Sequence, residues 1–196
     1  MFKRLFDIVA SFLGLLVLLI PFMIVAILIK TTSHGGVFYC QTRIGKNESE
    51  FKIIKFRTMI ANSGKGQLIT TGDDKRITKV GRFLRKAKID ELPQLFNVLI
   101  GNMSLVGPRP EVAKYVSLYN EQQRKVLSVK PGITDPASII YRNENSLLSD
   151  SENPEEKYIT EIMPKKLEIN LVYIEKQSFW YDIKIIFKTI GLIFKN

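Results

Sequence analysis

The residues with the clearest chemical potential are two adjacent carboxylates, Asp90 and Glu91, within the stretch KIDELPQLFNVLIGNMSLVGPRPE (residues 88–111). A helix that begins here would explain both without any chemistry. Asp90 could cap the first turn, and Glu91 would favour the positive end of the helix dipole. The same helix end also attracts anions such as phosphates. A structural role and a phosphate-handling role therefore both stay open.

Cations lie close to this acidic pair in the sequence. Arg85 precedes it, and Arg109 follows it between Pro108 and Pro110. Those prolines restrict the backbone and help to fix where the guanidinium points, and arginine makes bidentate phosphate contacts. A carboxylate among fixed cations stays ionised, so Asp90 could hold Mg²⁺ beside substrate phosphates or attack phosphorus as a nucleophile. Arg109 could equally belong to an ordinary surface turn.

A second basic pair lies in the stretch KFRTM. Lys55 and Arg57 alternate with Phe56 along a predicted strand, so they would share one face of it. They are candidates for further phosphate contacts. The solvated face of an ordinary strand would look the same.

Composition narrows the chemistry that such a site could use. The 196 residues suffice for one domain with a real core, and the net charge of +10 indicates an anionic partner: a nucleotide phosphate, an anionic lipid surface or nucleic acid. Cys40 is the only cysteine and His34 the only histidine, which excludes an internal disulfide and multi-histidine or cysteine-based metal clusters. Catalysis must rest on carboxylates, Arg, Lys, hydroxyls or a carboxylate-held metal.

The amino-terminal segment is a membrane signal. Residues 8–29 carry no charge, and as one straight helix they would rise about 33 Å, enough for a hydrocarbon core. Pro21 interrupts this helix by removing a backbone hydrogen bond, and basic residues flank both ends, which favours one cytoplasmic side for both. We predict a re-entrant helix-break-helix over residues 1–30. A single-pass anchor and a buried core helix are the alternatives.

The remaining sequence, residues 31–196, predicts a small, mostly helical α+β cytoplasmic domain. A hairpin is expected from residues 37–44 and 51–58, around a turn-like GKNES. Residues 60–74 are rich in Gly, Ser and Asn and predict a loop. Further helices are expected over residues 75–86 with Asp73 or Asp74 as N-cap, from Asp90 through Pro93 to Gly101 with an apolar stripe of Leu92, Leu95, Phe96 and Leu99, over 111–129, and over 153–177 with a bend at Pro164.

The carboxyl-terminal residues 178–196 predict an amphipathic helix. Its apolar face would hold Ile183, Ile186, Phe187, Ile190, Ile193 and Phe194, opposite Lys184, Lys188 and Lys195 and beside Trp180 and Tyr181. This pattern is typical of an interfacial helix that lies on a lipid surface. An ordinary helix docked on the core is the alternative.

With these motifs in order, the sequence resembles the bacterial sugar transferases, the monotopic phosphoglycosyl transferases. The resemblance rests on FKRLFDIVASFL followed by a proline, KIIKFRTM, ITKVGRFLRKAKIDELPQLFNVLIGNMSLVGPRPE and YNEQQRKVLSVKPGIT. It is specific over residues 2–134 and weaker beyond. The order KFRTM, DELPQ, GPRP is much more specific than any one motif.

The resemblance implies a reaction. Similar proteins transfer a phosphosugar from a nucleotide diphosphosugar, usually a UDP-sugar, to polyprenyl phosphate such as undecaprenyl phosphate, and release a nucleoside monophosphate. The matching Asp90 would be the nucleophile that forms a covalent phosphosugar intermediate. Glu91 would bind Mg²⁺ or activate the lipid phosphate. The resemblance also implies a re-entrant helix broken at Pro21 and a place on the cytoplasmic face of the bacterial inner membrane.

Two departures from the family pattern are visible. Many relatives have Ser before the membrane proline, where this chain has Ile20, which cannot satisfy a freed backbone group. After KPGIT many relatives read Gly-Trp-Ala-Gln, where this chain reads Asp-Pro-Ala-Ser at 135–138, so sugar contacts there cannot be carried over. Arg142, in YRNE, is a candidate nucleotide or phosphate contact.

Two other functions compete with this interpretation. One is a membrane-anchored, Mg²⁺-dependent phosphohydrolase that uses Asp90 and releases free sugar phosphate. The other is a non-catalytic basic protein tethered to the membrane. Nucleic acid is not expected as a partner, because the aromatic residues sit mostly in apolar stripes and not on an open basic sheet. The sequence names neither the sugar, the base, the polyprenol length nor the oligomeric state.

Overall fold

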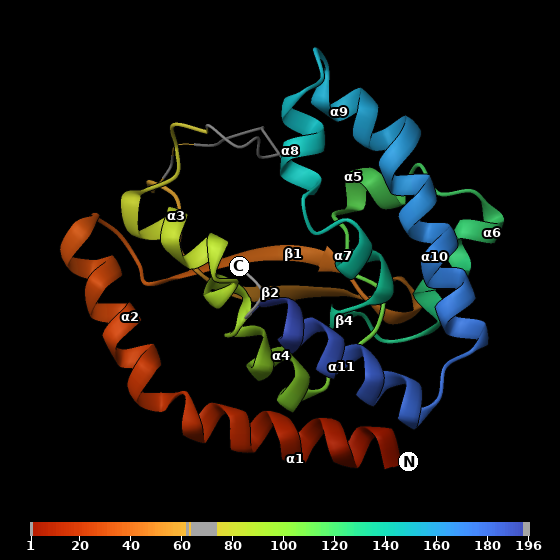
Figure 1. Ribbon diagram of the computed structural model, residues 1–196, viewed down its shortest axis with the longest axis horizontal. Coiled ribbons are helices and arrows are strands. Elements are labelled where there is room, and N and C mark those ends of the chain that lie inside the picture. The colour runs from red at the N-terminus through yellow and green to blue at the C-terminus, as the bar shows by residue number, and fades with distance from the viewer. Residues whose placement is uncertain (1, 62, 64–73, 194–196) are drawn as a thin grey trace.

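The computed structural model describes residues 2–61, 63 and 74–193 (Figure 1). The described residues form a mixed helix and strand fold that is mostly helical, as the sequence predicts, with two small sheets. The helices are α1 (Phe2–Val17), α2 (Leu19–Thr32), α3 (Lys79–Lys86), α4 (Gln94–Ile100), α5 (Ala113–Val116), α6 (Glu121–Arg124), α7 (Pro136–Ile140), α8 (Glu144–Ser149), α9 (Pro154–Lys157), α10 (Met163–Glu175) and α11 (Phe179–Ile193). The strands are β1 (Phe38–Ile44), β2 (Glu50–Phe56), β3 (Ser104–Val106) and β4 (Gly132–Thr134), and single tight or wide turns form η1 (Lys46–Glu48), η2 (Ile89–Glu91), η3 (Lys125–Ser128) and η4 (Tyr158–Ile162).

The amino-terminal helix breaks as predicted, but one turn earlier than Pro21. Helices α1 and α2 meet at Leu18 with a bend of 60°, and Pro21 lies in the first turn of α2. A proline ring clashes with the carbonyl four residues before it and offers that carbonyl no hydrogen. The carbonyl affected here is that of Val17, the last residue of α1, so the break falls directly after it. Leu18 N still donates to Gly14 O (2.9 Å) and Phe22 N to Leu18 O (2.8 Å) on either side.

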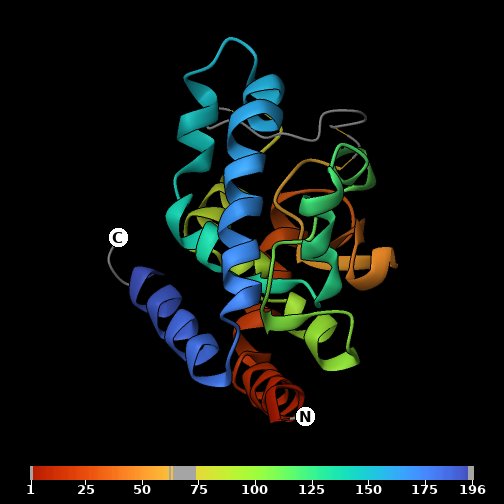
Figure 2. The same cartoon turned by 90° about the vertical axis from the view of Figure 1, so that its right-hand side faces the viewer.

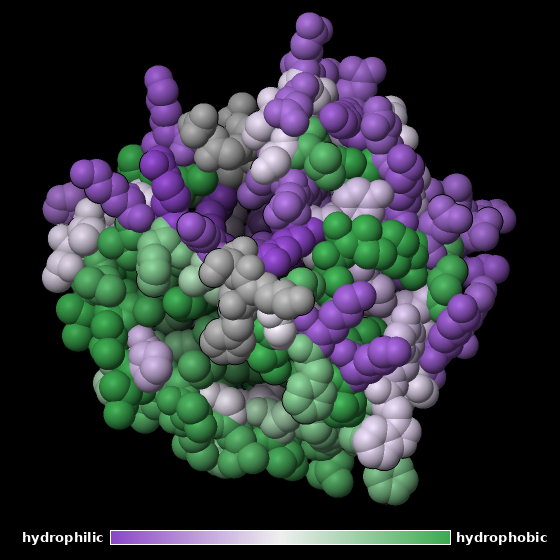
Figure 3. Space-filling model, in the orientation of Figure 1, coloured by the Kyte–Doolittle hydropathy of each residue, from purple (hydrophilic) through white to green (hydrophobic). Residues whose placement is uncertain are grey.

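Both of these helices expose an apolar face. Within the described ranges no single helix is long and apolar enough to cross a membrane, and only the bent pair reaches the required length and hydropathy together. Figure 3 shows this apolar surface along the lower left of the molecule, over α1 and α2. Its large exposed side chains include Leu5, Phe12, Leu13, Leu16, Val17, Leu19, Ile20, Met23, Ile24 and Ile27.

The opposite face of α1 is bound to the rest of the fold by polar contacts. Asp7 is only 3% exposed and accepts a hydrogen bond from Ser104 Oγ (2.8 Å) at the start of β3. Arg4 donates to the carbonyls of Val98 (2.6 Å) and Leu99 (3.0 Å). These are among the last carbonyls of α4, which have no partner inside their own helix. Arg4 therefore caps α4 at its carboxyl end.

The two sheets sit between these helices and the helices α5–α10 (Figure 1). The predicted hairpin is confirmed: β1 and β2 pair antiparallel, with Phe38 opposite Phe56 and Ile44 opposite Glu50. The short parallel pair β3–β4 was not predicted. It needs glycine at position 132, because a Cβ there would lie 2.1 Å from the Gly107 nitrogen.

The predicted start of α3 is wrong. Thr78 is the N-cap, and its Oγ1 accepts a hydrogen bond from Gly81 N (2.9 Å). Asp74 instead pairs with Arg76, and Asp73 lies outside the described residues, as does most of the loop expected over residues 60–74. The segment expected as one helix after Glu111 forms the short α5, α6 and η3, while Gly101 ends α4 in the left-handed region, as predicted.

The long helix expected over residues 153–177 is observed as α9, η4 and α10. Its π-helical turn η4 ends one residue before α10 begins, and Pro164 follows at the start of α10. Beneath it lies the largest apolar cluster, which contains Tyr115, Tyr119, Tyr158 and Leu167. Figure 2 shows α10 running along this side of the molecule.

Helix α11 is docked on the core along one side and exposes large apolar side chains on another. Ile185 is 4% exposed and packs with Val106 and Tyr173, so one side of the helix is docked on the core. Trp180 (77% exposed) and Phe187 (70% exposed) point outward. The predicted apolar face is therefore divided between core and surface, and Phe194 and Lys195 lie outside the described residues.

Replacement of Pro21 by Ala should straighten the α1–α2 pair, because alanine restores the missing N–H and removes the ring clash. Spin labels at the exposed positions Leu5 and Ile27, in a Cys40→Ser background, report the change by pulsed electron paramagnetic resonance. We expect the distance to lengthen toward about 33 Å, the value for a continuous helix. Pro154→Ala is the matched control, since Pro154 lies at the first position of α9, where proline is tolerated. An unchanged distance in Pro21→Ala would show that docking on the body alone sets the bend.

Candidate active site

The two carboxylates occupy η2, the single 3₁₀ turn between α3 and α4. The prediction that Asp90 caps α4 is wrong, because the N-cap position is Pro93 and no side chain caps this helix. Main-chain bonds from Leu92 N to Ile89 O (3.2 Å) and Leu95 N to Leu92 O (3.0 Å) continue through the junction. The Asp90 carboxylate is therefore not consumed by the helix end.

Glu91 is held from two sides. Lys55 of β2 donates to its Oε1 (2.8 Å), and Arg109 donates to both oxygens, with Nη1 to Oε2 at 3.1 Å and Nη2 to Oε1. Burial alone would raise the pKa of Glu91. The charges of Arg109 and Lys55 outweigh it and hold that pKa well below its usual range. Glu91 is thus a fixed anion.

Asp90 is treated in the opposite way. It is 8% exposed, and no hydrogen bond joins its carboxylate to another residue in the part of the chain that the structure describes. Burial, followed by the charge of Glu91, raises its pKa to about 6, against opposing contributions from Lys55, Arg85 and Lys88. Burial thus outweighs the neighbouring cations in setting the direction of this pKa shift, but the expectation that Asp90 stays ionised is kept. At neutral pH the group is still ionised and has unused lone pairs.

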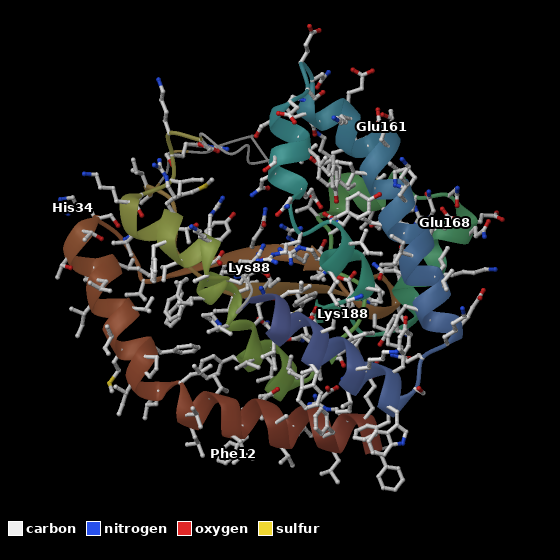
Figure 4. The ribbon with its side chains drawn as sticks, viewed as in Figure 1. Phe12, His34, Lys88, Glu161, Glu168 and Lys188 are labelled. Carbon is white, nitrogen blue, oxygen red and sulfur yellow. The ribbon has the colours of Figure 1, made fainter. Side chains whose placement is uncertain are left out.

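The structure gathers some of the predicted cations around this pair. Lys55 and Arg109 contact Glu91 directly. Arg85 donates through Nε to Thr58 Oγ1 (2.8 Å), and burial lowers its pKa, although the charge of Asp90 opposes this. Figure 4 shows the labelled Lys88 near the centre of the view, where α3 meets α4. The sequence places Arg85 and Lys88 just upstream of the acidic pair, and Lys88 lies two residues before Asp90.

Two other predicted cations are not brought to the pair. Arg57 donates to the carbonyls of Gly36 (2.6 Å), His34 and Ser33 (2.9 Å). Its guanidinium therefore anchors the connection between α2 and β1 and does not share a phosphate-binding face with Lys55. The reason is that β2 ends at Phe56, where the alternation of strand faces stops. Arg142 lies in the turn between α7 and α8, and no hydrogen bond or ion pair joins its side chain to a described residue.

The prolines near the pair fix backbone around it. Pro93 is buried at the start of α4. Pro108 O accepts a hydrogen bond from Gly132 N (3.0 Å) and Pro110 O accepts one from Arg43 (3.1 Å). The segment between β3 and α5 is thereby joined to both sheets.

Residues that sequence reasoning missed lie directly after this turn. The Glu111 carboxylate accepts a hydrogen bond from the Tyr158 hydroxyl and forms an ion pair with Arg43 (3.3 Å). Glu111 follows the GPRP motif immediately, which is the one local signal that could have singled it out. Arg43 and Tyr158 come from distant parts of the chain and carry no such signal.

The region where relatives differ has a structural role here. Asp135 is fully buried and is the N-cap of α7, with its carboxylate accepting from Ser138 N (2.9 Å) and Ser138 Oγ (2.6 Å). Its side chain is therefore occupied by the cap, so these two residues are not available as sugar contacts.

The donor set at the pair suits Mg²⁺ only in part. Among the residues the structure describes, no group of three or more His, Cys, Asp or Glu side chains is placed to hold a metal ion. Mg²⁺ commonly takes one or two carboxylates and completes its shell with waters and substrate phosphates. Asp90 has free oxygens, and the Glu91 oxygens keep lone pairs beyond those used by Lys55 and Arg109. The two carboxylates therefore fit an ion that arrives with a phosphate ligand.

In a comparison with family models, residues 1–196 match the model described as bacterial sugar transferase. The chain belongs to the bacterial sugar transferase family. This confirms the resemblance that the sequence motifs indicated.

Curated relatives match almost the whole length of the chain. It is 41% identical over all of its length to the UDP-glucose:undecaprenyl-phosphate glucose-1-phosphate transferase of Klebsiella pneumoniae, covering 40% of that protein. It is 39% identical to the UDP-N-acetylgalactosamine-undecaprenyl-phosphate N-acetylgalactosaminephosphotransferase of Aeromonas hydrophila, over 97% of this chain and 43% of that protein. The uncharacterized sugar transferase EpsL of Bacillus subtilis is 39% identical, over 96% and 85%. The chain thus spans about two-fifths of the first two relatives.

Replacement of Asp90 by Asn should stabilise the fold at neutral pH. The pKa of Asp90 rises from 3.8 to about 6 on folding. The free energy of unfolding therefore falls as pH rises from about 4 to 6, and this loss stays constant at higher pH. Asparagine does not ionise, so the replacement should raise the free energy of unfolding by about 1–3 kcal/mol above pH 6. The measurement is the melting temperature of both proteins between pH 4 and 8, with the exposed Asp150→Asn as control. An Asp90→Asn gain that is equal at pH 4 and pH 8 would contradict the raised pKa.

Proposed function

We propose that the chain is a phosphoglycosyl transferase that moves a sugar-1-phosphate from a UDP-sugar to undecaprenyl phosphate. The observation that carries the proposal is the contrast at η2. Asp90 is buried and its carboxylate makes no hydrogen bond to a described residue, whereas the adjacent Glu91 is fixed by Lys55 and Arg109. A free carboxylate beside a rigid charged frame is the arrangement that nucleophilic catalysis on phosphorus requires. The names of the relatives from Klebsiella pneumoniae and Aeromonas hydrophila supply the substrate classes.

The reaction would proceed in two displacements at one phosphorus atom. An Asp90 oxygen attacks the sugar-side phosphorus of the UDP-sugar, and the bond from that phosphorus to the bridging oxygen breaks, so that UMP leaves. The phosphosugar is then bound to Asp90 as an acyl phosphate. A phosphate oxygen of undecaprenyl phosphate attacks the same phosphorus, the Asp90–phosphorus bond breaks, and polyprenyl diphosphosugar forms. The free Asp90 carboxylate is regenerated.

The surrounding charges have distinct tasks in this scheme. Arg85 and Lys88 act on Asp90 electrostatically, and they are available to offset the charge of the incoming diphosphate. Arg109 has five donors and uses two on Glu91, so the others remain for phosphate oxygens. Asp90 and Glu91 would hold Mg²⁺ together with the diphosphate. When bound, this ion neutralises phosphate charge and helps the leaving group depart.

A long-chain lipid phosphate requires access from a bilayer. We propose that α1 and α2 form a re-entrant membrane element and that the exposed side of α11, with Trp180 and Phe187, lies in the lipid interface. Basic flanks at Lys3, Arg4 and Lys30 favour the cytoplasmic face of the bacterial inner membrane. Residues 1–30 would then be the membrane element and residues 31–196 the cytoplasmic catalytic domain, with α11 as its interfacial part.

Asp90 should be indispensable for UMP release. The assay mixes the protein in lipid nanodiscs with a panel of UDP-sugars, Mg²⁺ and undecaprenyl phosphate, and measures UMP. We expect Asp90→Asn to lose more than about a thousandfold in rate and Glu91→Gln about a hundredfold, because the first removes the attacking atom and the second its frame. Exposed carboxylates provide the matched controls Asp150→Asn and Glu161→Gln, which should retain the wild-type rate.

Two further arms separate the competing functions. Omission of undecaprenyl phosphate should leave only a stoichiometric burst of UMP, whereas a phosphohydrolase would continue to turn over. Removal of Mg²⁺ with a chelator should abolish release, because the diphosphate charge is then uncompensated. UMP release by Asp90→Asn at the wild-type rate would rule out the nucleophile.

The membrane arrangement predicts a common side for both chain ends. Tags placed before Phe2 and after Asn196 should both be modified by a reagent confined to the cytoplasmic side of oriented vesicles, because the bent α1–α2 pair returns to the face it enters. A tag in the α9 region, near exposed Asn153, serves as the cytoplasmic reference. Modification of the two terminal tags from opposite sides would exclude a re-entrant element.

A further inference from the structure

The turn that carries Arg109 is attached at both of its ends. At one end Gly107 N donates to O of Thr134 (3.0 Å), the last residue of β4. At the other end Ile44 N donates to Glu111 O (2.9 Å), which joins the turn to the last residue of β1. Between these two attachments, the Arg109 side chain reaches Glu91. Its position therefore depends on how firmly the turn is held.

The side chain of Glu111 adds a second attachment at the same end. Its Oε1 accepts a hydrogen bond from the Tyr158 hydroxyl, and its Oε2 lies 3.3 Å from Nη1 of Arg43. The same Arg43 nitrogen donates to Pro110 O (3.1 Å), one residue after Arg109. Charge-assisted bonds of this kind are among the strongest that a buried site can form. Glu111 thus links the turn to β1 and to the helix α9–α10.

Tyr158 is well fixed at its own end of this link. It is 5% exposed and begins the π-helical turn η4. Its ring lies 5.1 Å from that of Tyr115, and Lys166 Nζ lies 5.6 Å from its centre. Burial and the charge of Glu111 raise its pKa well above the usual value, so the hydroxyl stays protonated and remains a donor. π-turns inside helices frequently occur at functional sites.

We propose that Glu111 and Tyr158 are positioning residues for Arg109, and through it for Glu91 beside the nucleophile. The inference rests on the proposed transferase function for its catalytic consequence, but not for its geometry. Tyr158 holds Glu111, Glu111 and Arg43 hold the turn, and the turn sets the Arg109 guanidinium against Glu91. Tyr158, Glu111 and Arg43 make no hydrogen bond to Asp90.

The neighbouring Tyr115 offers a matched control. It lies in the same apolar cluster as Tyr158, is 3% exposed, and its hydroxyl donates to Glu155 (3.1 Å). The side chain of Glu155 is 44% exposed, belongs to α9 and pairs with Lys114, not with the turn that carries Arg109. Each tyrosine of this apolar cluster donates one hydrogen bond to a glutamate, so removal of either hydroxyl deletes one such bond. Only Tyr158 leads to Arg109.

The test compares Tyr158→Phe and Tyr115→Phe in the wild-type and Arg109→Ala backgrounds, using the full chain in nanodiscs. In the wild-type background we expect Tyr158→Phe to lower kcat for UMP release about tenfold, whereas Tyr115→Phe stays within about twofold. In the Arg109→Ala background Tyr158→Phe should cost less than about twofold more, because residues that act as one unit are not additive. A tenfold loss that persists without Arg109, or an equal loss in both single variants, would overturn the proposal.

A second readout does not depend on activity. In protein labelled with ¹⁵N-arginine, the Nε–Hε signal of Arg109, assigned by its loss in Arg109→Lys, reports how firmly the guanidinium is held. We expect this signal to be sharp in the wild type and in Tyr115→Phe, and broadened by solvent exchange in Tyr158→Phe and Glu111→Gln. An unchanged signal in both latter variants would refute the positioning role even if no UDP-sugar were turned over. Absence of UMP release by the wild type, with the signal behaving as expected, would refute the transferase function alone.

Discussion

The ion pair between Glu91 and Arg109 is the contact on which the arrangement of the site depends. Three separate parts of the chain meet there: β2 supplies Lys55, η2 supplies Glu91, and the turn after β3 supplies Arg109. A buried charge pair costs desolvation on formation, but removal of one partner leaves the other uncompensated, at a cost of roughly 3–5 kcal/mol. The site is therefore stable only as a complete set.

This pair also explains why two adjacent carboxylates behave differently. Lys55 and Arg109 form hydrogen bonds with Glu91. The cations act on Asp90 only through their charge, without a hydrogen bond. Asp90 lies in a buried position with a fixed negative charge next to it, which raises the free energy of its ionised form. As the proposed nucleophile, Asp90 would gain more from contact with phosphorus because its carboxylate is poorly satisfied in the free protein. Stability lost at Asp90 is consistent with the usual conflict between stability and function at such sites.

The amino-terminal helices and the site form one mechanical unit. Arg4 caps the carboxyl end of α4 while η2 with both carboxylates precedes its amino end. Helix α4 has only seven residues, so the two ends are separated by about 10 Å. Val25 and Ile29 of α2 pack in one cluster with Phe56 and Leu84, which adjoin Lys55 and Arg85 in the sequence. The bent α1–α2 pair, which we propose as the membrane element, thus packs against the sequence neighbours of Lys55 and Arg85.

The sequence by itself determined the features that depend on local chemistry. Pro21 lacks an N–H, so a break in the first helix was expected, and Gly101 was expected to end the helix after Pro93. The alternation of the hairpin and the motifs KFRTM, DELPQ and GPRP also identified Lys55, Asp90, Glu91 and Arg109 as one group. Each of these features is expressed within a few residues of its cause.

Only the tertiary structure decided how the side chains were shared among partners. It paired Arg57 with main-chain carbonyls and brought Arg43 and Tyr158 to Glu111. It also kept the Asp90 side chain out of the cap of α4. The position of the helix break depended on which carbonyl the proline ring meets, and the exposure of α11 on which side docks on the core. Burial and long-range pairing compete for the same charged groups. That competition is settled by distances between residues far apart in the chain, which no local pattern encodes.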